Sequence, residues 1–217
     1  MRRCEFWVAL PDSTLSDSSH LRDKTVKTGL IGRACAVFRV QGVYIYRDLR
    51  GGEEGDLKLM KTLLEYMELP QYLRKRVYSR SRELAYVGLL PPLRTPHHKL
   101  EVEPSSIKVG EHREGIAVKV KGSMHVDCGL ASLIPLEGEV QENARVTVCF
   151  TSLYPNLKAK VADKGRLEEY WGYRVREAPS LAKLLRGVKP SLLVFTSRRG
   201  VSIQDIWGEL ARGLRDA

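Results

Sequence analysis

The feature that most constrains the fold is a proline-rich segment near the middle of the chain, Leu89-Leu-Pro-Pro-Leu-Arg-Thr-Pro96. Proline has no backbone N–H, so this segment continues neither a helix nor a central strand. Helical periodicity before the segment is replaced after it by short apolar runs separated by turn residues. We therefore predict that the segment is a linker between two structural units.

Strands and helices alternate before the linker. The apolar run Glu5–Leu10 ends at Pro11 and is typical of a buried strand. Apolar residues recur at steps of three and four from Leu21 to Phe38 and from Leu57 to Met67, which predicts two helices. The run Val43–Tyr46 lies between them and predicts a second strand. The order strand, helix, strand, helix is typical of a parallel α/β sheet.

After the linker, short runs rich in valine and isoleucine predict a small antiparallel barrel. The predicted strands are Gly115–Val120, Met124–Cys128, Ser132–Leu136, Arg145–Phe150 and Lys158–Ala162. Five short strands in about fifty residues match the size of an OB-like barrel, a fold that often binds oligonucleotides.

The α/β pattern returns after Gly165. We predict a strand at Tyr170–Val175, a helix at Leu181–Leu185, a buried apolar strand at Leu192–Thr196 and a final helix at Ile203–Leu214. The predicted fold class is therefore α/β. A parallel-sheet domain, residues 1–95 and 164–217, is interrupted by an OB-like β-barrel, residues 96–163.

The charge of the chain is patterned and favours a polyanionic partner, with RNA the first candidate. The net charge is +10, and the segments 21–50 and 71–99 have net charges of +5 and +6, whereas 51–70 has −3. Tyr72, Tyr78 and Tyr86 alternate with basic residues, a combination used by single-stranded RNA sites. The alternative for any one cation is a solvated helix face. The residues expected to contact RNA are Arg22, Lys24, Lys27, Arg74, Lys75, Arg76, Arg80, Arg82 and Arg94.

The cysteines and histidines do not predict a metal site. The four cysteines, Cys4, Cys35, Cys128 and Cys149, are far apart, and we expect reduced thiols. His97-His98 are adjacent, and on an extended segment their side chains point in opposite directions, so we expect a turn or linker role.

No membrane segment is expected. No stretch approaches the roughly 20 apolar residues needed to cross a bilayer, and no signal-peptide core follows the N-terminus. We expect a soluble, cytoplasmic protein.

Two short segments are candidates for chemistry. Arg33 lies in an apolar helical stretch with small neighbours, so it either reaches solvent from the helix edge or points into a cleft where an anionic substrate balances it. Thr196-Ser-Arg-Arg-Gly200 follows the last predicted strand, where α/β sheets place ligand-binding loops. Its amides and guanidiniums could hold a phosphate or carboxylate. The alternative is a polar loop.

Six segments, in order along the chain, together span most of its length. The segments are Val8–Asp12, Lys27–Phe38, Pro70–Lys75, Val87–His98, His112–Ile116 and Tyr170–Val175. Together they resemble the archaeal and eukaryotic branch of the SPOUT (α/β-knot) RNA methyltransferases that contain an OB-like insert.

The resemblance implies S-adenosylmethionine-dependent methyl transfer to a base of RNA, rRNA or tRNA, by a homodimer. Arg33 matches the arginine of the family's first motif, near the methyl-acceptor site at the dimer interface, and could stabilise charge that develops on the base. Thr196 and Ser197 would border the cofactor pocket.

The resemblance also implies a further segment. Family members continue past the helix ending near Leu214 into a knotted segment with most of the cofactor contacts, whereas this sequence stops at Ala217. We therefore expect a truncated product, weak or inactive alone. The alternative is a non-catalytic RNA-binding module built from an α/β platform and the barrel.

Overall fold

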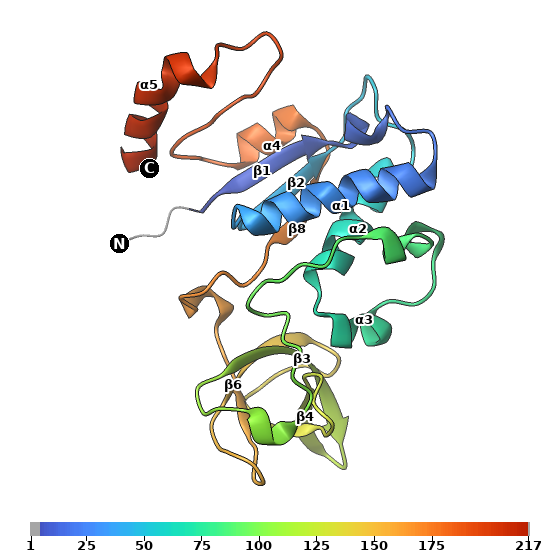
Figure 1. The fold of residues 1–217 in the computed structure, drawn as a ribbon, viewed down its shortest axis with the longest axis vertical. Helices are drawn as coiled ribbons and strands as arrows, with labels where there is room; N and C mark the ends of the chain where they lie inside the picture. The colour runs from blue at the N-terminus through green and yellow to red at the C-terminus, as the bar shows by residue number, and fades with distance from the viewer. Residues whose placement is uncertain (1–4, 217) are drawn as a thin grey trace.

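The computed structural model describes residues 5–216, and these form two units joined by two chain segments (Figure 1). The first unit is built around a parallel sheet, and the second is a closed barrel. The chain leaves the first unit through the proline-rich segment and returns from the barrel after about residue 162.

The sheet contains three parallel strands in the order β1-β2-β8. The strands are β1 (Trp7–Pro11), β2 (Gly42–Tyr46) and β8 (Arg174–Ala178). Val43 of β2 pairs with Val8 on one side and Val175 on the other. The last strand of the sheet therefore comes from the part of the chain that follows the barrel.

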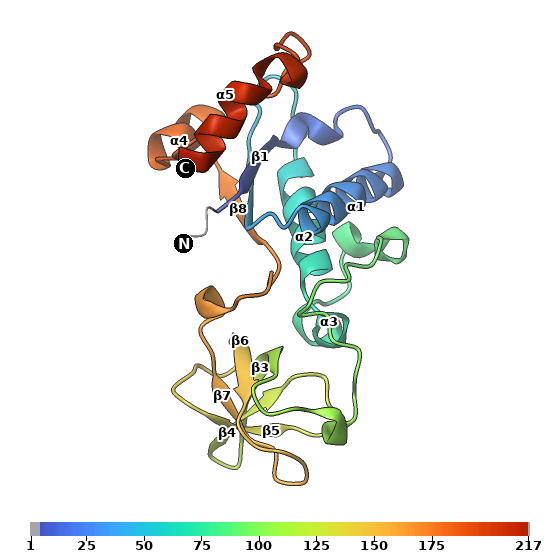
Figure 2. The same cartoon turned by 60° about the vertical axis from the view of Figure 1, so that its left-hand side comes forward.

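Helices cover both faces of this sheet (Figure 2). On one side lie α1 (Leu21–Val37) and α2 (Asp56–Glu68), and on the other lie α4 (Leu181–Gly187) and α5 (Ile203–Asp216). A short helix, α3 (Gln71–Val77), follows α2.

The barrel closes in the strand order β3-β4-β5-β7-β6. All neighbouring pairs are antiparallel except β5 and β7, which are parallel. Its strands are β3 (His112–Val120), β4 (Ser123–Asp127), β5 (Ile134–Glu137), β6 (Arg145–Phe150) and β7 (Ala159–Val161).

Each unit has its own hydrophobic core. Buried side chains of α1, α2 and the sheet form one cluster, with Leu63, Leu64 and Ile45 fully buried. Val148 and Phe150 are fully buried in a second cluster inside the barrel. A smaller cluster of Leu69, Leu73 and Ile116 joins the two units.

Most elements predicted from the sequence are present. The mixed α/β class, both early helices, both early strands, all five barrel strands and the last helix are confirmed, with small shifts at their ends. The region of the linker has a short 3-10 helix at Val87–Leu89 and is then irregular as far as Glu103.

The strand predicted at Tyr170–Val175 begins four residues later. Gly172 has a φ of +79°, a left-handed conformation that interrupts an extended run. A Cβ at Gly172 would also lie too close to the carboxylate of Glu68 and to His97. Trp171 and Tyr173 are consequently turned into the protein interior, where both are buried.

The buried strand predicted at Leu192–Thr196 was wrong. Leu193, Val194 and Phe195 are 50%, 53% and 64% exposed, and the segment has no strand pairing among the described residues. An apolar run forms a strand only beside another strand's free edge, and Leu192 instead lies beside Gly213 of α5.

Within residues 5–216, no helix is both long and apolar enough to cross a membrane. Cys35, Cys128 and Cys149 are free thiols, as expected, and Cys4 lies outside the described residues. Burial raises the pKa of Cys35 and of Cys128 to about 11, so both remain protonated.

Candidate functional site

Arg33 lies on the exposed face of α1 and reaches solvent, the first of the two expected placements. On the opposite face, Gly29 and Gly32 are in close contact with the linker and α2: an added Cβ would come within 2.9 Å of Pro91 and of Met67. The small residues therefore allow close packing on one side and leave Arg33 on the other.

The exposed face around Arg33 is unusually apolar for a surface helix. Leu30, Val37 and Phe38 are 61%, 66% and 72% exposed, and Val26 is 38% exposed. These positions recur at helical spacing on either side of Arg33. A cation thus lies within a continuous exposed apolar stripe on α1.

Lys24 is buried rather than available to a ligand. Its ammonium lies 2.5 Å from a carboxylate oxygen of Glu53 and 2.8 Å from one of Asp56. Burial alone would lower its pKa, but hydrogen bonds to the two carboxylates raise it. Lys24 is an internal ion-pair partner that fastens α1 to the start of α2. Lys27 pairs with Asp17 at 2.7 Å and stays partly exposed.

Two of the basic residues after α2 have structural partners. Arg74 donates to the carbonyl oxygens of Leu69 and Met67, at 3.0 and 3.1 Å, and so caps the end of α2. Arg76 forms an ion pair of 3.0 Å with Asp127 of the barrel.

The other predicted contacts are solvent-exposed. Arg22, Lys75, Arg80, Arg82 and Arg94 are all exposed.

Of the three tyrosines between these cations, two contact other parts of the protein and one is exposed. Tyr72 donates to the carbonyl oxygen of Glu114, and the ring centroid of Tyr78 lies 5.3 Å from that of Tyr66. Both tyrosines pack against the small cluster that joins the two units. Tyr86 is 42% exposed.

Thr196 and Ser197 lie in an exposed irregular segment. The hydroxyl oxygen of Ser197 accepts a hydrogen bond from the backbone N–H of Arg199, and its carbonyl accepts one from Gly200. One exposed turn cannot enclose an adenosine and a sulfonium group. The residues present here therefore do not fit S-adenosylmethionine by themselves.

An ion-pair network around two buried carboxylates joins the two units. Arg145 of β6 contacts both carboxylate oxygens of Glu68 of α2, at 2.6 and 3.1 Å, and its Nε lies 2.6 Å from Glu114 of β3. Glu114 also accepts hydrogen bonds from Thr147 and from the indole of Trp171. Both buried carboxylates are therefore paired, as buried charges must be, with an arginine whose side chain is 32% exposed.

Both linker histidines point at this network. Nε2 of His97 and Nε2 of His98 each lie 2.9 Å from the carbonyl oxygen of Glu68. The expectation that adjacent side chains diverge was wrong because the chain turns here, with a hydrogen bond from His98 N to Thr95 O. The expected turn role is confirmed.

The network shifts the acidity of its members. Burial would raise the pKa of Glu68, but the hydrogen bond from His97 and the charges of Arg145 and Lys164 lower it far below its usual range. Burial, reinforced by His97, lowers the pKa of His98 to about 4. At neutral pH Glu68 is thus ionised and His98 is neutral.

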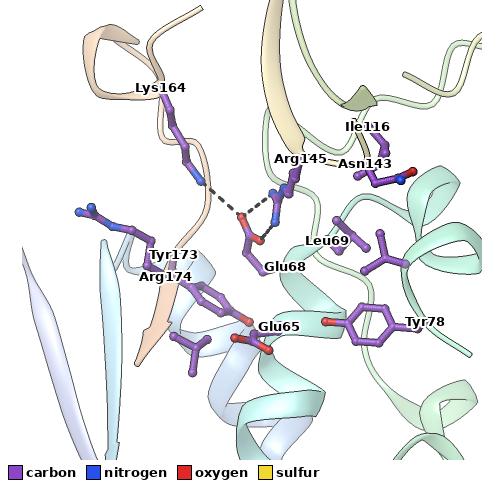
Figure 3. A pocket seen from close by; sticks show the side chains of 12 residues that line it. Glu65, Glu68, Leu69, Tyr78, Ile116, Asn143, Arg145, Lys164, Tyr173 and Arg174 are labelled. Atoms are coloured by element: carbon purple, nitrogen blue, oxygen red, sulfur yellow. Dashed lines mark hydrogen bonds and ion pairs between the residues drawn. The ribbon is translucent and has the colours of Figure 1, made fainter. Parts of the chain in front are cut away.

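A cavity of about 400 Å³ opens beside this network, between the two units (Figure 3). The side chains of Glu65, Tyr78, Arg145, Lys164 and Tyr173 line it. Comparable volumes hold small organic ligands. This junction pocket was not predicted from the sequence.

Comparison with known proteins identifies the family. A family model described as "Putative RNA methyltransferase" matches residues 5–214. The chain is 32% identical over 217 residues to an uncharacterized protein of Halobacterium salinarum, and the match covers 96% of this chain and 74% of that protein. The chain belongs to this RNA methyltransferase family.

A human protein and a second haloarchaeal protein are also similar to this chain. A human 28S rRNA (uridine-N(3))-methyltransferase is 30% identical over 225 residues, which cover 90% of this chain and 58% of the human protein. An uncharacterized protein of Haloarcula marismortui is 34% identical over 162 residues, 72% of this chain and 56% of that protein. The chain thus spans less than two thirds of the length of both.

Four of the segments that suggested the RNA methyltransferase resemblance meet at the junction. They supply Tyr72, His97, Glu114 and Trp171. Sequence reasoning missed Glu68 and Arg145, which are 77 residues apart and have no local pattern that marks a pair.

Proposed function

We propose that this chain takes part in S-adenosylmethionine-dependent methylation of a base in RNA, as a member of the SPOUT class. The observation that carries the proposal is the family match over residues 5–214. The parallel sheet interrupted by a barrel, with OB-like size, supports the class. The name of the human relative supports uridine in ribosomal RNA as the substrate.

The exposed stripe on α1 supports a homodimer. Leu30, Val37 and Phe38 would be removed from water against a second copy, and apolar burial drives most association. The guanidinium of Arg33 would then lie at the dimer interface. There it would stabilise the negative charge of a base that has lost its N–H proton.

We further propose that the exposed cations hold the RNA. This surface consists of Arg22, Lys27, Lys75, Arg76, Arg80, Arg82 and Arg94. Lys24 is left out because its charge is buried and paired, and Arg74 because it caps α2.

The two separate cores support the division into units at residues 1–95 with 164–217 and at residues 96–163. S-adenosylmethionine would supply the methyl group. Thr196 and Ser197 would form one wall of its site, against a surface outside their own segment.

A non-catalytic RNA-binding module is the second candidate, and the exposure of the segment around Thr196 favours it. Titration calorimetry separates the two functions. For the enzyme we expect a saturable isotherm with S-adenosylmethionine at micromolar affinity. No heat with the cofactor from a chain that still binds RNA would overturn the enzyme and leave the module.

A further inference from the structure

The junction pocket has the size and polar groups for one unpaired base, and we propose that it binds a uracil of an RNA strand that crosses between the two units. The inference rests on the RNA-binding function proposed above and adds a specific site to it. The pocket is lined by α2, by the segment after α3, by the barrel and by the return segment.

Glu65 provides an acceptor that lacks a protein donor. Its carboxylate is half-buried, and within residues 5–216 it forms no ion pair or hydrogen bond. Burial raises the pKa of Glu65. The charge of Lys61 opposes this effect, and the charges of Glu177 and Glu68 add to it. A polar group removed from water without a partner is destabilising, so a ligand N–H placed here would be favourable.

Lys164 provides a donor on the other side of the pocket. Its ammonium lies 3.6 Å from Glu68, too far for a hydrogen bond, and its side chain is 38% exposed. Glu65 and Glu68 are one helical turn apart on the same face of α2. In Figure 3, Lys164 and Glu65 approach the pocket from different sides.

The acceptor and the donor suit the edge of uracil, which presents a carbonyl oxygen, an N–H and a second carbonyl oxygen in a row. Glu65 would accept from N3–H, and Lys164 would donate to a carbonyl oxygen. Adenine has no carbonyl oxygen, and N3 of cytosine is an acceptor that the carboxylate of Glu65 would repel. Guanine has an N–H beside one carbonyl oxygen, but it presents an amino group where uracil has its second carbonyl oxygen.

Tyr78 provides an aromatic wall for the base. Its ring lines the pocket, and its hydroxyl points toward the same space as the Glu65 carboxylate (Figure 3). Burial, together with the charge of Glu65, raises the pKa of Tyr78 to about 12, so the ring stays neutral. Unpaired RNA bases commonly stack on such rings.

Cations flank the pocket on both chain segments. Arg80 and Arg82 follow Tyr78 closely in the chain, and Arg166, with 88% of its side chain exposed, follows Lys164. The phosphates before and after the bound base would thus lie near positive charge from both segments.

The test uses two fluorescein-labelled single-stranded RNAs of equal length, oligo(U) and oligo(A), and measures binding by fluorescence anisotropy. Wild type should prefer oligo(U) by about tenfold, the effect of one hydrogen bond to a charged group. Glu65→Gln should reduce the preference to the part that Lys164 contributes, because an amide can pair with either base. Lys164→Met should weaken oligo(U) by a similar factor.

Glu169→Gln is the matched control, since it removes the same charge at an exposed position outside the pocket lining. Equal binding of the two RNAs by wild type, or a preference that Glu65→Gln leaves at its wild-type size, overturns the pocket and leaves RNA binding intact. No binding of either RNA overturns both the pocket and the proposed function.

Discussion

Arg145 decides how the two units are joined. Its guanidinium satisfies two buried carboxylates, Glu68 and Glu114, that belong to different units. A buried ion pair contributes little net stability, but removal of one partner leaves uncompensated charge. At the residue scale, Arg145 therefore fixes the relative position of sheet and barrel, and with it the shape of the junction pocket.

His98 should make stability depend on pH. Burial lowers its folded pKa to about 4, below the roughly 6.5 of an unfolded histidine. The unfolded chain then binds more protons, so this stabilisation is complete above pH 6.5 and is lost as pH falls toward 4. We expect a loss of about 2 kcal/mol in the free energy of unfolding between about pH 7 and pH 5.

Urea unfolding of wild type and His98→Gln across that range measures the effect. Glutamine keeps a donor for the carbonyl oxygen of Glu68 but does not titrate, so the variant should lose much less stability on acidification. Equal losses in the two proteins would show that His98 is not responsible.

At the scale of elements, the local sequence pattern predicts a helix or strand correctly where the periodicity of its own apolar residues determines how it packs. The helix over Leu21–Val37 and the barrel strands were predicted for this reason. The strand predicted at Leu192–Thr196 was wrong because a strand also requires the free edge of a neighbouring strand, and an apolar run in the sequence does not indicate whether one is present. The junction pocket could not be predicted because its members come from distant segments.

The exposed stripe of α1 leads to a prediction about assembly. Leu30→Glu should place a charge in the proposed dimer interface and weaken the dimer at least tenfold, since burial of an unpaired charge is unfavourable. Because Leu30 is exposed in the single chain, the melting temperature of the monomer should not change. Sedimentation equilibrium measures the assembly.

Leu100→Glu makes the same change at a residue that is 81% exposed and lies in the irregular segment after the linker, so it is the control for the added charge. If the Leu30→Glu protein sediments like wild type, the interface is not on this face of α1.

At the scale of the whole molecule, the structure places the cations that were predicted to contact RNA. Of the nine cations predicted to contact RNA, those that remain at least partly exposed lie on α1, on and after α3 and in the linker, whereas Lys24 and Arg74 are used inside the α/β unit. An RNA strand held along these elements would pass the junction pocket. The two units would then bind one RNA together. The family match indicates that methyl transfer is the reaction to test.

The most direct test is transfer of a radiolabelled methyl group from S-adenosylmethionine to ribosomal RNA. The proposed function predicts weak but measurable incorporation by the chain and at least a tenfold lower rate for Arg33→Ala, while Arg186→Ala, an exposed change on α4, keeps the wild-type rate. RNA that is bound but remains unlabelled would contradict the enzyme and assign the chain to RNA binding alone.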